Sequence, residues 1–331
     1  MDKRTLGSTG PQVGAIGLGL MGMSGMYGPS DEQEGIATVH AALDAGVTLL
    51  DTGDFYGMGH NELLLHDALR GRRREDVVVS VKFGAQRDYD GNWLGYDGSP
   101  AAVKTALAYT LRRLRTDYVD VYRPARLDRN VPIEDTVGAI KDMVDAGHVR
   151  HIGLSEVGAR TLRRAAAVAP IADLQIEYSL ISRGIEAEIL PTARELGIGV
   201  TAYGVLSRGL LSGSWDPSRA LAQGDFRAHS PRFQGENLQQ NLTLVEALRR
   251  VAAERGATPA QVAIAWVAGQ GADVVPLVGA RTRERLAESL GAADLKLSSA
   301  DLVSVAAAVP ADAVAGDRYP EHSMRDLDSE R

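Results

Sequence analysis

The sequence predicts a closed (β/α)8 barrel, the TIM barrel, formed as one domain by residues 1–331. Three observations lead to this prediction. Short apolar runs rich in β-branched residues recur eight times, stretches with helical spacing lie between them, and the 331 residues exceed the about 250 that such a barrel commonly needs. Near-continuous apolar strands that alternate with helices indicate a parallel sheet buried on both faces. The same pattern also allows an open, doubly wound sheet, which is the alternative.

The expected strands share an apolar centre, and they are 14–19, 47–53, 77–84, 118–123, 149–156, 173–179, 199–204 and 273–279. The clearest expected helices are 31–46, 99–114, 133–147, 185–197 and 241–256. Several of these helices begin at Asp, Ser or Asn and end at Gly, as helix caps require. Residues 207–240 are expected to form an insertion above the barrel, and 298–309 a last helix outside it. The polar tail 310–331 is either a disordered end or a flap over the top face.

The composition excludes several classes of function. There is no cysteine, which excludes disulfides, thiolate metal sites and cysteine nucleophiles. The first residues lack the apolar core of a signal peptide, and no run reaches the roughly 18 apolar residues of a membrane helix, so the expected location is the cytoplasm. A net charge of −7 argues against nucleic acid or an anionic membrane as a partner. The oligomeric state stays open.

The segment GLGLMG (17–22) matches the glycine pattern of dinucleotide-binding folds. That pattern requires a helix directly after it, whereas the next ten residues, MSGMYGPSDE, contain glycines and a proline that prevent one. We therefore expect a loop after the first strand, whose glycines let the backbone approach a ligand closely. Gly19 and Met21 are its candidate cofactor contacts.

Polar residues stand at the carboxyl ends of the expected strands, where a barrel of this kind holds its active site. Asp51 and Lys82 end the second and third strands, and Tyr56 lies on the loop after the second. One interpretation is a purely structural ion pair between Asp51 and Lys82. The other is chemical: an ammonium held by a carboxylate lowers the pKa of the tyrosine, which then donates a proton during carbonyl reduction. The chain has no redox group of its own, so a nicotinamide must supply the hydride.

The eighth strand is followed by a turn and a helix dense in arginine, VVPLVGARTRERLAESLGA (274–292). Amide groups at a helix N-terminus bind phosphate, and arginine clamps it. In an otherwise acidic protein, these arginines predict a 2′-phosphate and therefore NADP. The alternative is a solvated helix with i,i+4 ion pairs.

Taken together, these segments resemble the aldo-keto reductase superfamily over nearly the whole chain. DTGDFYGMGHNELLLHDAL (51–69) resembles the signature D-T-A-x-x-Y-G-x-x-x-E-x-x-L, with Gly53 where Ala is usual. VVVSVKFG resembles the strand of the catalytic lysine. HIGLSE, LQIEYSL, TAYGVLSRGLLSG and VPLVGART resemble the later cofactor-binding segments.

The resemblance implies an NADP-dependent enzyme that reduces a small carbonyl substrate to an alcohol, or runs the reverse reaction. Tyr56 would be the general acid, Lys82 the modulator of its pKa and Asp51 the partner of Lys82. The implied cofactor contacts are Ser155 and Gln175 at the carboxamide, Tyr203 on the nicotinamide ring, Gly204, Leu206, Arg208 and Gly209 at the pyrophosphate, Gly279, Arg281, Thr282 and Arg285 at the adenosine phosphate, and Glu288 and Ser289 at the adenine.

One position departs from the family pattern. The fourth-strand motif resembles D-Y-I-D-L-Y-x-x-H-R-x-D, and its histidine falls on Ala125. Side chains of a strand alternate, so Arg123 shares a face with Ala125 and is expected to point inward, toward Asp51 or the substrate oxygen. A water in the space left by Ala125 is the other option, and an outward Arg123, moved by Pro124, is the alternative to both. Arg126 is expected to face the helix layer or to pair with Asp128.

Two functions follow from this departure. The first is an active reductase in which Arg123, or water, orients the carbonyl. The second is an NADP-binding protein of weak or no activity that acts as a sensor or partner-binding module, because losing one acid–base group costs on the order of 10²–10⁴ in rate.

Overall fold

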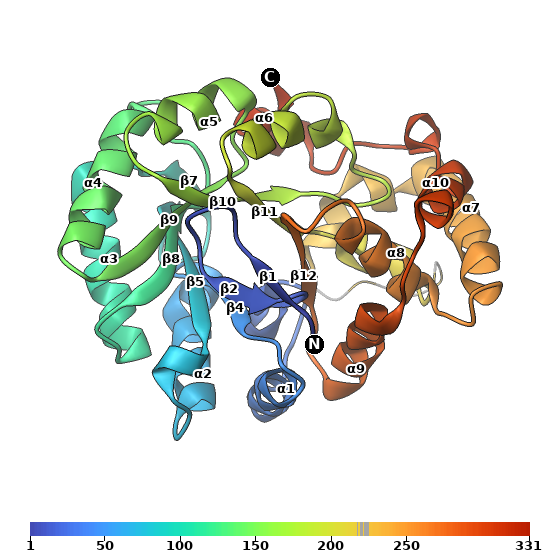
Figure 1. The fold of residues 1–331 in the computed structure, drawn as a ribbon, viewed down its shortest axis with the longest axis horizontal. Helices are drawn as coiled ribbons and strands as arrows, with labels where there is room; N and C mark the ends of the chain where they lie inside the picture. Colours follow the sequence, from blue (N-terminus) through green and yellow to red (C-terminus); the bar gives the residue numbers. More distant parts are fainter. Residues whose placement is uncertain (217, 219–220, 222–224) are drawn as a thin grey trace.

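The closed barrel predicted from the sequence is confirmed by a computed structural model, which describes all residues except 217, 219–220 and 222–224 (Figure 1). Its parallel strands follow one another around the barrel in chain order, and the last pairs with the first. They are β3 (Gly17–Gly19), β4 (Leu49–Gly53), β5 (Val78–Phe83), β8 (Val119–Pro124), β9 (Val149–Ser155), β10 (Ile171–Glu177), β11 (Gly199–Tyr203) and β12 (Val274–Gly279). All eight lie within two residues of the expected strands or inside them.

Helices connect the strands and surround the barrel (Figure 1). They are α1 (Glu32–Asp44), α2 (His60–Leu69), α3 (Pro100–Leu114), α4 (Ile133–Asp145), α5 (Ala159–Ala166), α6 (Ile189–Glu195), α7 (Gly235–Ala253), α8 (Pro259–Ala268), α9 (Arg283–Leu290), α10 (Ser299–Ala308) and α11 (Glu321–Met324). The expected helix 185–197 is shorter, because a 3-10 turn, Gly184–Glu186, precedes α6. The helix expected at 241–256 begins earlier, at Gly235. As expected, α10 lies outside the ring, against α7 and α8.

Two β-hairpins were not predicted from the sequence. The first, β1 (Lys3–Thr5) and β2 (Gln12–Gly14), precedes β3 and so lies at the amino-terminal end of the barrel, where Leu6 and Val13 pack against Leu49 and Leu277. The second, β6 (Ala85–Arg87) and β7 (Trp93–Tyr96), follows β5 at the opposite end. Both strands of each hairpin are too short for period-two alternation to be recognised in the sequence.

The interior of the barrel contains charged groups as well as apolar ones. The large apolar core lies between the strands and the helices. Inside the barrel, Arg123, Asp173, Ser80 and Thr201 form a buried polar layer linked by hydrogen bonds. Because each group has a partner, the cost of burying these charges is offset in part.

The tail 310–331 folds back onto the barrel. Its C-terminus lies beside α5 and α6 (Figure 1). The backbone N–H of Gly158, just before α5, donates to Asp328 at 2.8 Å, and Ser329 N–H donates to the carbonyl of Glu156 at 3.2 Å. Leu327 and Arg318 are buried. Of the two options for the tail, the ordered flap is therefore the one that the structure adopts.

Candidate active site

Asp51 and Lys82 form a buried ion pair at the carboxyl ends of two neighbouring strands. The register pairs Gly53 with Lys82, so both side chains enter the same end of the barrel. Lys82 Nζ donates to Asp51 Oδ1, and both side chains are at most 5% exposed. Ser80 and Gln175 donate to Asp51 Oδ2 at 2.8 and 2.7 Å. Burial lowers the pKa of Lys82, and Asp51 opposes that change. Both carboxylate oxygens of Asp51 are thus hydrogen-bonded, which fixes the pair in place.

Tyr56 lies directly above this pair. It begins a 3-10 turn, Tyr56–Gly59, in which Gly57 and Met58 have φ values of 57° and 54°. Its ring centroid is 5.1 Å from Lys82 Nζ, and the residue is 5% exposed. Burial and then the charge of Asp51 raise the pKa of Tyr56 well above its usual value, while Arg126 acts in the opposite direction. The sequence analysis expected a lowered pKa, and it underestimated desolvation. A raised pKa keeps Tyr56 protonated, as a proton donor must be.

Arg123 points into the barrel as expected, but it does not reach Asp51. Its Nη1 donates to Asp173 Oδ2 at 3.0 Å and its Nη2 to Ser80 Oγ at 2.8 Å, with no exposed surface on either charged side chain. Asp173 also accepts from Thr201. These contacts hold Arg123 in the polar layer. Its guanidinium therefore does not face the carboxyl-terminal end of the barrel, here called the mouth, where a substrate would lie.

Arg126 was misplaced by the sequence analysis, which directed it to the helix layer or to Asp128. In the structure, Asp128 instead accepts from the backbone of Gly98 and Asn130. Arg126 Nη1 donates to the carbonyl of Ala125 at 2.7 Å, and Nη2 is 3.5 Å from the hydroxyl of Tyr319. Strand β8 ends at Pro124, so the alternation of side chains does not extend to Arg126.

Ser155 and Tyr203, the expected nicotinamide contacts, lie at the same end of the barrel. Ser155 Oγ is buried and has no hydrogen-bond partner among the described residues. Tyr203 donates to Glu156 Oε1 at 2.7 Å, and its hydroxyl is 3.0 Å from that of Tyr319. Gln175 differs from the expectation in one respect, because its amide nitrogen is already bound to Asp51. An unpaired buried hydroxyl costs free energy, so Ser155 fits a polar ligand group.

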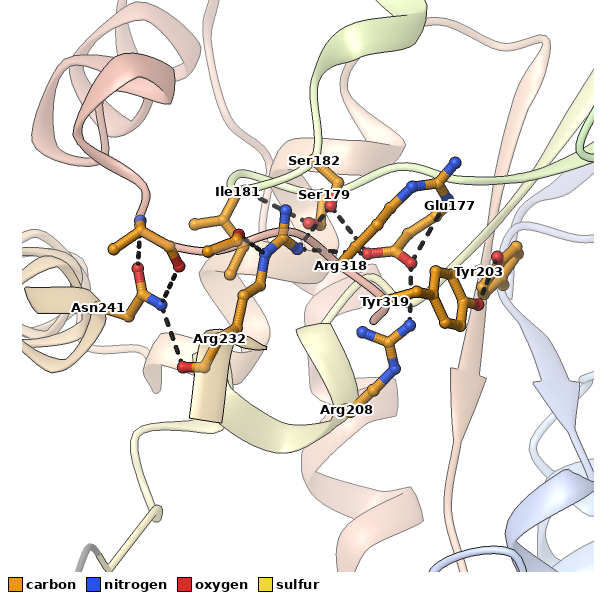
Figure 2. Close-up of polar contacts among 12 residues, drawn as sticks. Glu177, Ser179, Ile181, Ser182, Tyr203, Arg208, Arg232, Asn241, Arg318 and Tyr319 are labelled. Carbon is orange, nitrogen blue, oxygen red and sulfur yellow. Dashed lines mark hydrogen bonds and ion pairs between the residues drawn. The ribbon is translucent and has the colours of Figure 1, made fainter. Parts of the chain in front are cut away.

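A cluster of buried charges, Glu156, Glu177, Arg208, Arg232 and Arg318, lies beside Tyr203 and is here called the tail cluster. Figure 2 shows Arg208, Arg232 and Arg318 converging on Glu177. Arg318 also binds both oxygens of Glu156, at 2.8 and 2.7 Å. Arg318 holds the pKa of Glu156 far below its usual range, although burial opposes this. The sequence analysis missed this cluster, since no local pattern connects positions 156 and 318.

The loop after β11, expected at the pyrophosphate, has a strained backbone. Gly204, Ser207, Arg208 and Gly209 have φ values of 67°, 44°, 57° and 97°. Ser207 Oγ and Arg208 Nη1 are buried without a partner in the described part of the chain. Leu206, by contrast, is partly buried against the apolar core. A loop with buried polar groups that lack partners among the described residues fits an anionic ligand.

The turn between β12 and α9, expected at the adenosine phosphate, adjoins the loop after β3. Gly279 pairs with Gly19, and a side chain on Gly279 would meet open space. Thr282 caps α9 by accepting from Arg285 N at 3.3 Å. Arg281 donates to the carbonyls of Tyr27 and Pro29 at 3.1 and 3.2 Å, next to the 3-10 turn Met21–Ser24.

The remaining expected cofactor contacts lie on α9. Arg285 is exposed and 3.4 Å from Glu288, while Ser289 is buried. The i,i+3 pair of Arg285 and Glu288 agrees in part with the alternative of a solvated, ion-paired helix. Among the residues that the structure describes, no helix is long and apolar enough to cross a membrane, and no group of three or more acidic or histidine side chains could hold a metal ion.

Known proteins resemble this chain in sequence and in structure. The Aldo/keto reductase family profile matches residues 15–309. A "Probable aldo-keto reductase 1" of Glycine max is 43% identical over 316 residues, which cover 95% of this chain and 90% of the relative. A glycerol dehydrogenase from Gluconobacter oxydans has a TM-score of 0.84 at 27% identity, covering 94% of this chain and 96% of its own. The holo form of an aldo-keto reductase from Bacillus halodurans has a TM-score of 0.78 at 26% identity, covering 94% and 97%.

Proposed function

This chain belongs to the aldo/keto reductase family of carbonyl-reducing oxidoreductases, and we propose that it is an NADPH-dependent reductase of aldehydes or ketones in which Tyr56 donates the proton. The observation that carries the proposal is the arrangement of three side chains. The protonated Tyr56 stands above the buried pair of Lys82 and Asp51, at the end of the barrel where such enzymes hold their sites.

The cofactor is proposed to lie along one side of the mouth. Ser155 and Tyr203 would hold the nicotinamide, the loop 204–209 the pyrophosphate, and Arg281 and Thr282 the 2′-phosphate. Three buried atoms that have no hydrogen-bond partner among the described residues support this assignment, namely Ser155 Oγ, Ser207 Oγ and Arg208 Nη1. When bound, the nicotinamide supplies a hydride.

The residues of the chain would then act on the carbonyl oxygen. Tyr56 donates its proton to that oxygen as negative charge develops there. Lys82 stabilises the resulting phenolate electrostatically, and Asp51 keeps the ammonium charged and in place. Because Tyr56 is 5% exposed, bulk water has little access to the transferred proton.

The test is NADPH consumption, measured with a panel of aldehydes for the wild type and Tyr56→Phe. We expect wild-type turnover with at least one aldehyde, preference for NADPH over NADH, and a fall in kcat of about 100-fold or more in Tyr56→Phe. NADPH affinity should be unchanged, since the hydroxyl is proposed to act on the substrate. Tyr109→Phe, which removes the hydroxyl of an exposed tyrosine on α3, serves as the control.

Two outcomes would contradict the proposal. Full activity of Tyr56→Phe would reject Tyr56 as the proton donor. Tight NADPH binding without turnover on any aldehyde would favour the second function, a cofactor-binding sensor. That alternative rests on Ala125, which stands where the family has a histidine.

A further inference from the structure

Arg126 lies just after the end of β8, and its guanidinium reaches the tail residue Tyr319. Its two contacts, the carbonyl of Ala125 and the hydroxyl of Tyr319, hold the guanidinium from both ends. Tyr319 in turn meets Tyr203 at the end of β11. The residue is partly buried, and these two contacts are the hydrogen bonds that its guanidinium forms with the described residues.

No carboxylate of the described residues forms an ion pair with Arg126, although the charge of Glu156 acts on it and Asp51 belongs to the same site. Glu156 accepts from Arg318, Tyr203, Ser329 and the backbone of Glu177. Asp51 accepts from Lys82, Ser80 and Gln175. Both carboxylates are therefore committed to other donors. Burial alone would lower the pKa of Arg126, but its interactions with Tyr203, Tyr319 and Glu156 raise it, so the guanidinium stays charged.

The surrounding arginines are different. Arg123 is paired with Asp173, Arg208 and Arg232 with Glu177, and Arg318 with Glu156. A guanidinium without a carboxylate partner keeps donors that a ligand anion can bind. Arg126 thus has the donors and the charge of an anion-binding group.

The position of Arg126 argues against a cofactor phosphate as that anion. In the closed order of the barrel, β8 stands four strands from β12, which is directly across the mouth. The proposed phosphate contacts, Arg281 and Thr282, follow β12. By contrast, β8 adjoins β5, which carries Lys82, and the charge of Arg126 acts to lower the pKa of Tyr56. An anion at Arg126 therefore belongs to a molecule that reacts at Tyr56.

We propose that Arg126 binds the carboxylate of the substrate, so that the enzyme prefers aldehydes and ketones that carry a carboxylate group. The fork of a guanidinium matches the two oxygens of a carboxylate. A phosphate dianion calls for a second cation, and the neighbouring Lys82 is engaged by Asp51. The inference rests on the proposed function, since it names the substrate class of the same site.

The test compares two acids with their neutral methyl esters as substrates. The pairs are 4-carboxybenzaldehyde with methyl 4-formylbenzoate, and succinic semialdehyde with methyl 4-oxobutanoate. The wild type should have the higher kcat/KM for each acid. Arg126→Met should lower kcat/KM for the acids by about 10- to 100-fold more than for the esters, and this extra loss should appear mainly in KM. Because the charge of Arg126 also acts on Tyr56, any loss that acids and esters share should appear in kcat. Arg126→Lys should recover a part of the loss.

Arg129→Met is the matched control, because it removes the same charge from an exposed position three residues away. It should leave both acids and esters unchanged. An equal loss on acids and esters in Arg126→Met would overturn the proposal, since Arg126 would then act on the carbonyl itself or on the fold. A wild type without preference for the acids would overturn it as well.

A binding measurement separates this proposal from the proposed function. Ligand-observed NMR would follow the binding of 4-carboxybenzyl alcohol, with its methyl ester as the reference, to the wild type and Arg126→Met. We expect the acid to bind the variant at least about tenfold more weakly, even if neither protein turns over. Equal binding to both proteins would overturn the role of Arg126 without affecting that of Tyr56.

Discussion

The tail cluster lies at the same end of the barrel as Asp51, Tyr56, Lys82 and Arg126, which are called the catalytic cluster after their proposed role. The two clusters use their charges differently. In the tail cluster, each of the three arginines has a carboxylate partner. One of them, Arg318, joins the tail to Glu156, directly after β9, and to Glu177 in β10, and Figure 2 shows the second contact. In the catalytic cluster, the Lys82–Asp51 pair is complete, but Arg126 has no acidic partner in the described chain.

This difference separates Arg232 and Arg318, which maintain the fold, from Arg126, which is available to a ligand. Arg208 does both, because it pairs with Glu177 while its Nη1 is proposed to meet the cofactor. A paired and buried guanidinium holds two segments in register, and removing it leaves a buried carboxylate uncompensated. An unpaired guanidinium contributes little to the fold but offers donors to an anion. The same side chain type therefore predicts opposite consequences of substitution in the two clusters.

The largest expected effect is that of Arg318→Met in the tail cluster. The side chains of Arg318 and Glu156 are 7% and 0% exposed, so the variant leaves a buried carboxylate without its main partner. We expect a loss of about 3–5 kcal/mol in the free energy of unfolding, measured by urea denaturation, and faster proteolysis of the tail. Arg325→Met, which replaces an exposed arginine of the tail, should leave the midpoint of urea unfolding unchanged. Equal midpoints for wild type and Arg318→Met would show that the tail cluster does not hold the fold.

A smaller effect is expected from Asp54→Asn, beside the catalytic cluster. Burial, and then Glu62, raise the pKa of Asp54 to about 7, and its Oδ1 is buried without a partner in the described residues. Because the folded pKa exceeds the unfolded value of about 3.9, the folded state binds the extra proton, and stability falls as pH rises from about 4 through about 7. Asp54→Asn should thus stabilise the protein at pH 8 by roughly 1–3 kcal/mol and have little effect near pH 4.

The measurement is urea denaturation at several pH values between 4 and 8. Asp90→Asn, at an exposed loop position, is the control and should show no such pH dependence. An increase in the free energy of unfolding of Asp54→Asn that is the same at pH 4 and pH 8 would argue against a raised pKa of Asp54.

Much of the fold and the centre of the site could be predicted from the sequence. The eight strands are visible because each is a short apolar run bounded by turn residues. Asp51, Lys82 and Tyr56 could be brought together because the carboxyl ends of parallel strands meet at one end of a barrel. Those inferences depend on local patterns and on one general property of the fold.

The features that could not be predicted depend on contacts between distant positions or on the end of a strand. Two partners of Arg318, Glu156 and Glu177, lie more than a hundred residues away, and nothing in the tail sequence marks them. Alternation placed Arg123 correctly inside the barrel, but it did not apply to Arg126, because β8 ends at Pro124. The pKa of Tyr56 was expected in the wrong direction because the sequence does not reveal how completely the ring is buried.

The central claim is that the mouth binds two anions at opposite sides, the cofactor near β12 and a substrate carboxylate near β8. The most direct measurement is an NADPH titration, followed by protein fluorescence, of wild type, Arg126→Met and Arg281→Met. The account predicts an unchanged Kd for Arg126→Met and a Kd at least about tenfold higher for Arg281→Met. If Arg126→Met weakened NADPH binding as much as Arg281→Met does, the separation of the two anions would be contradicted.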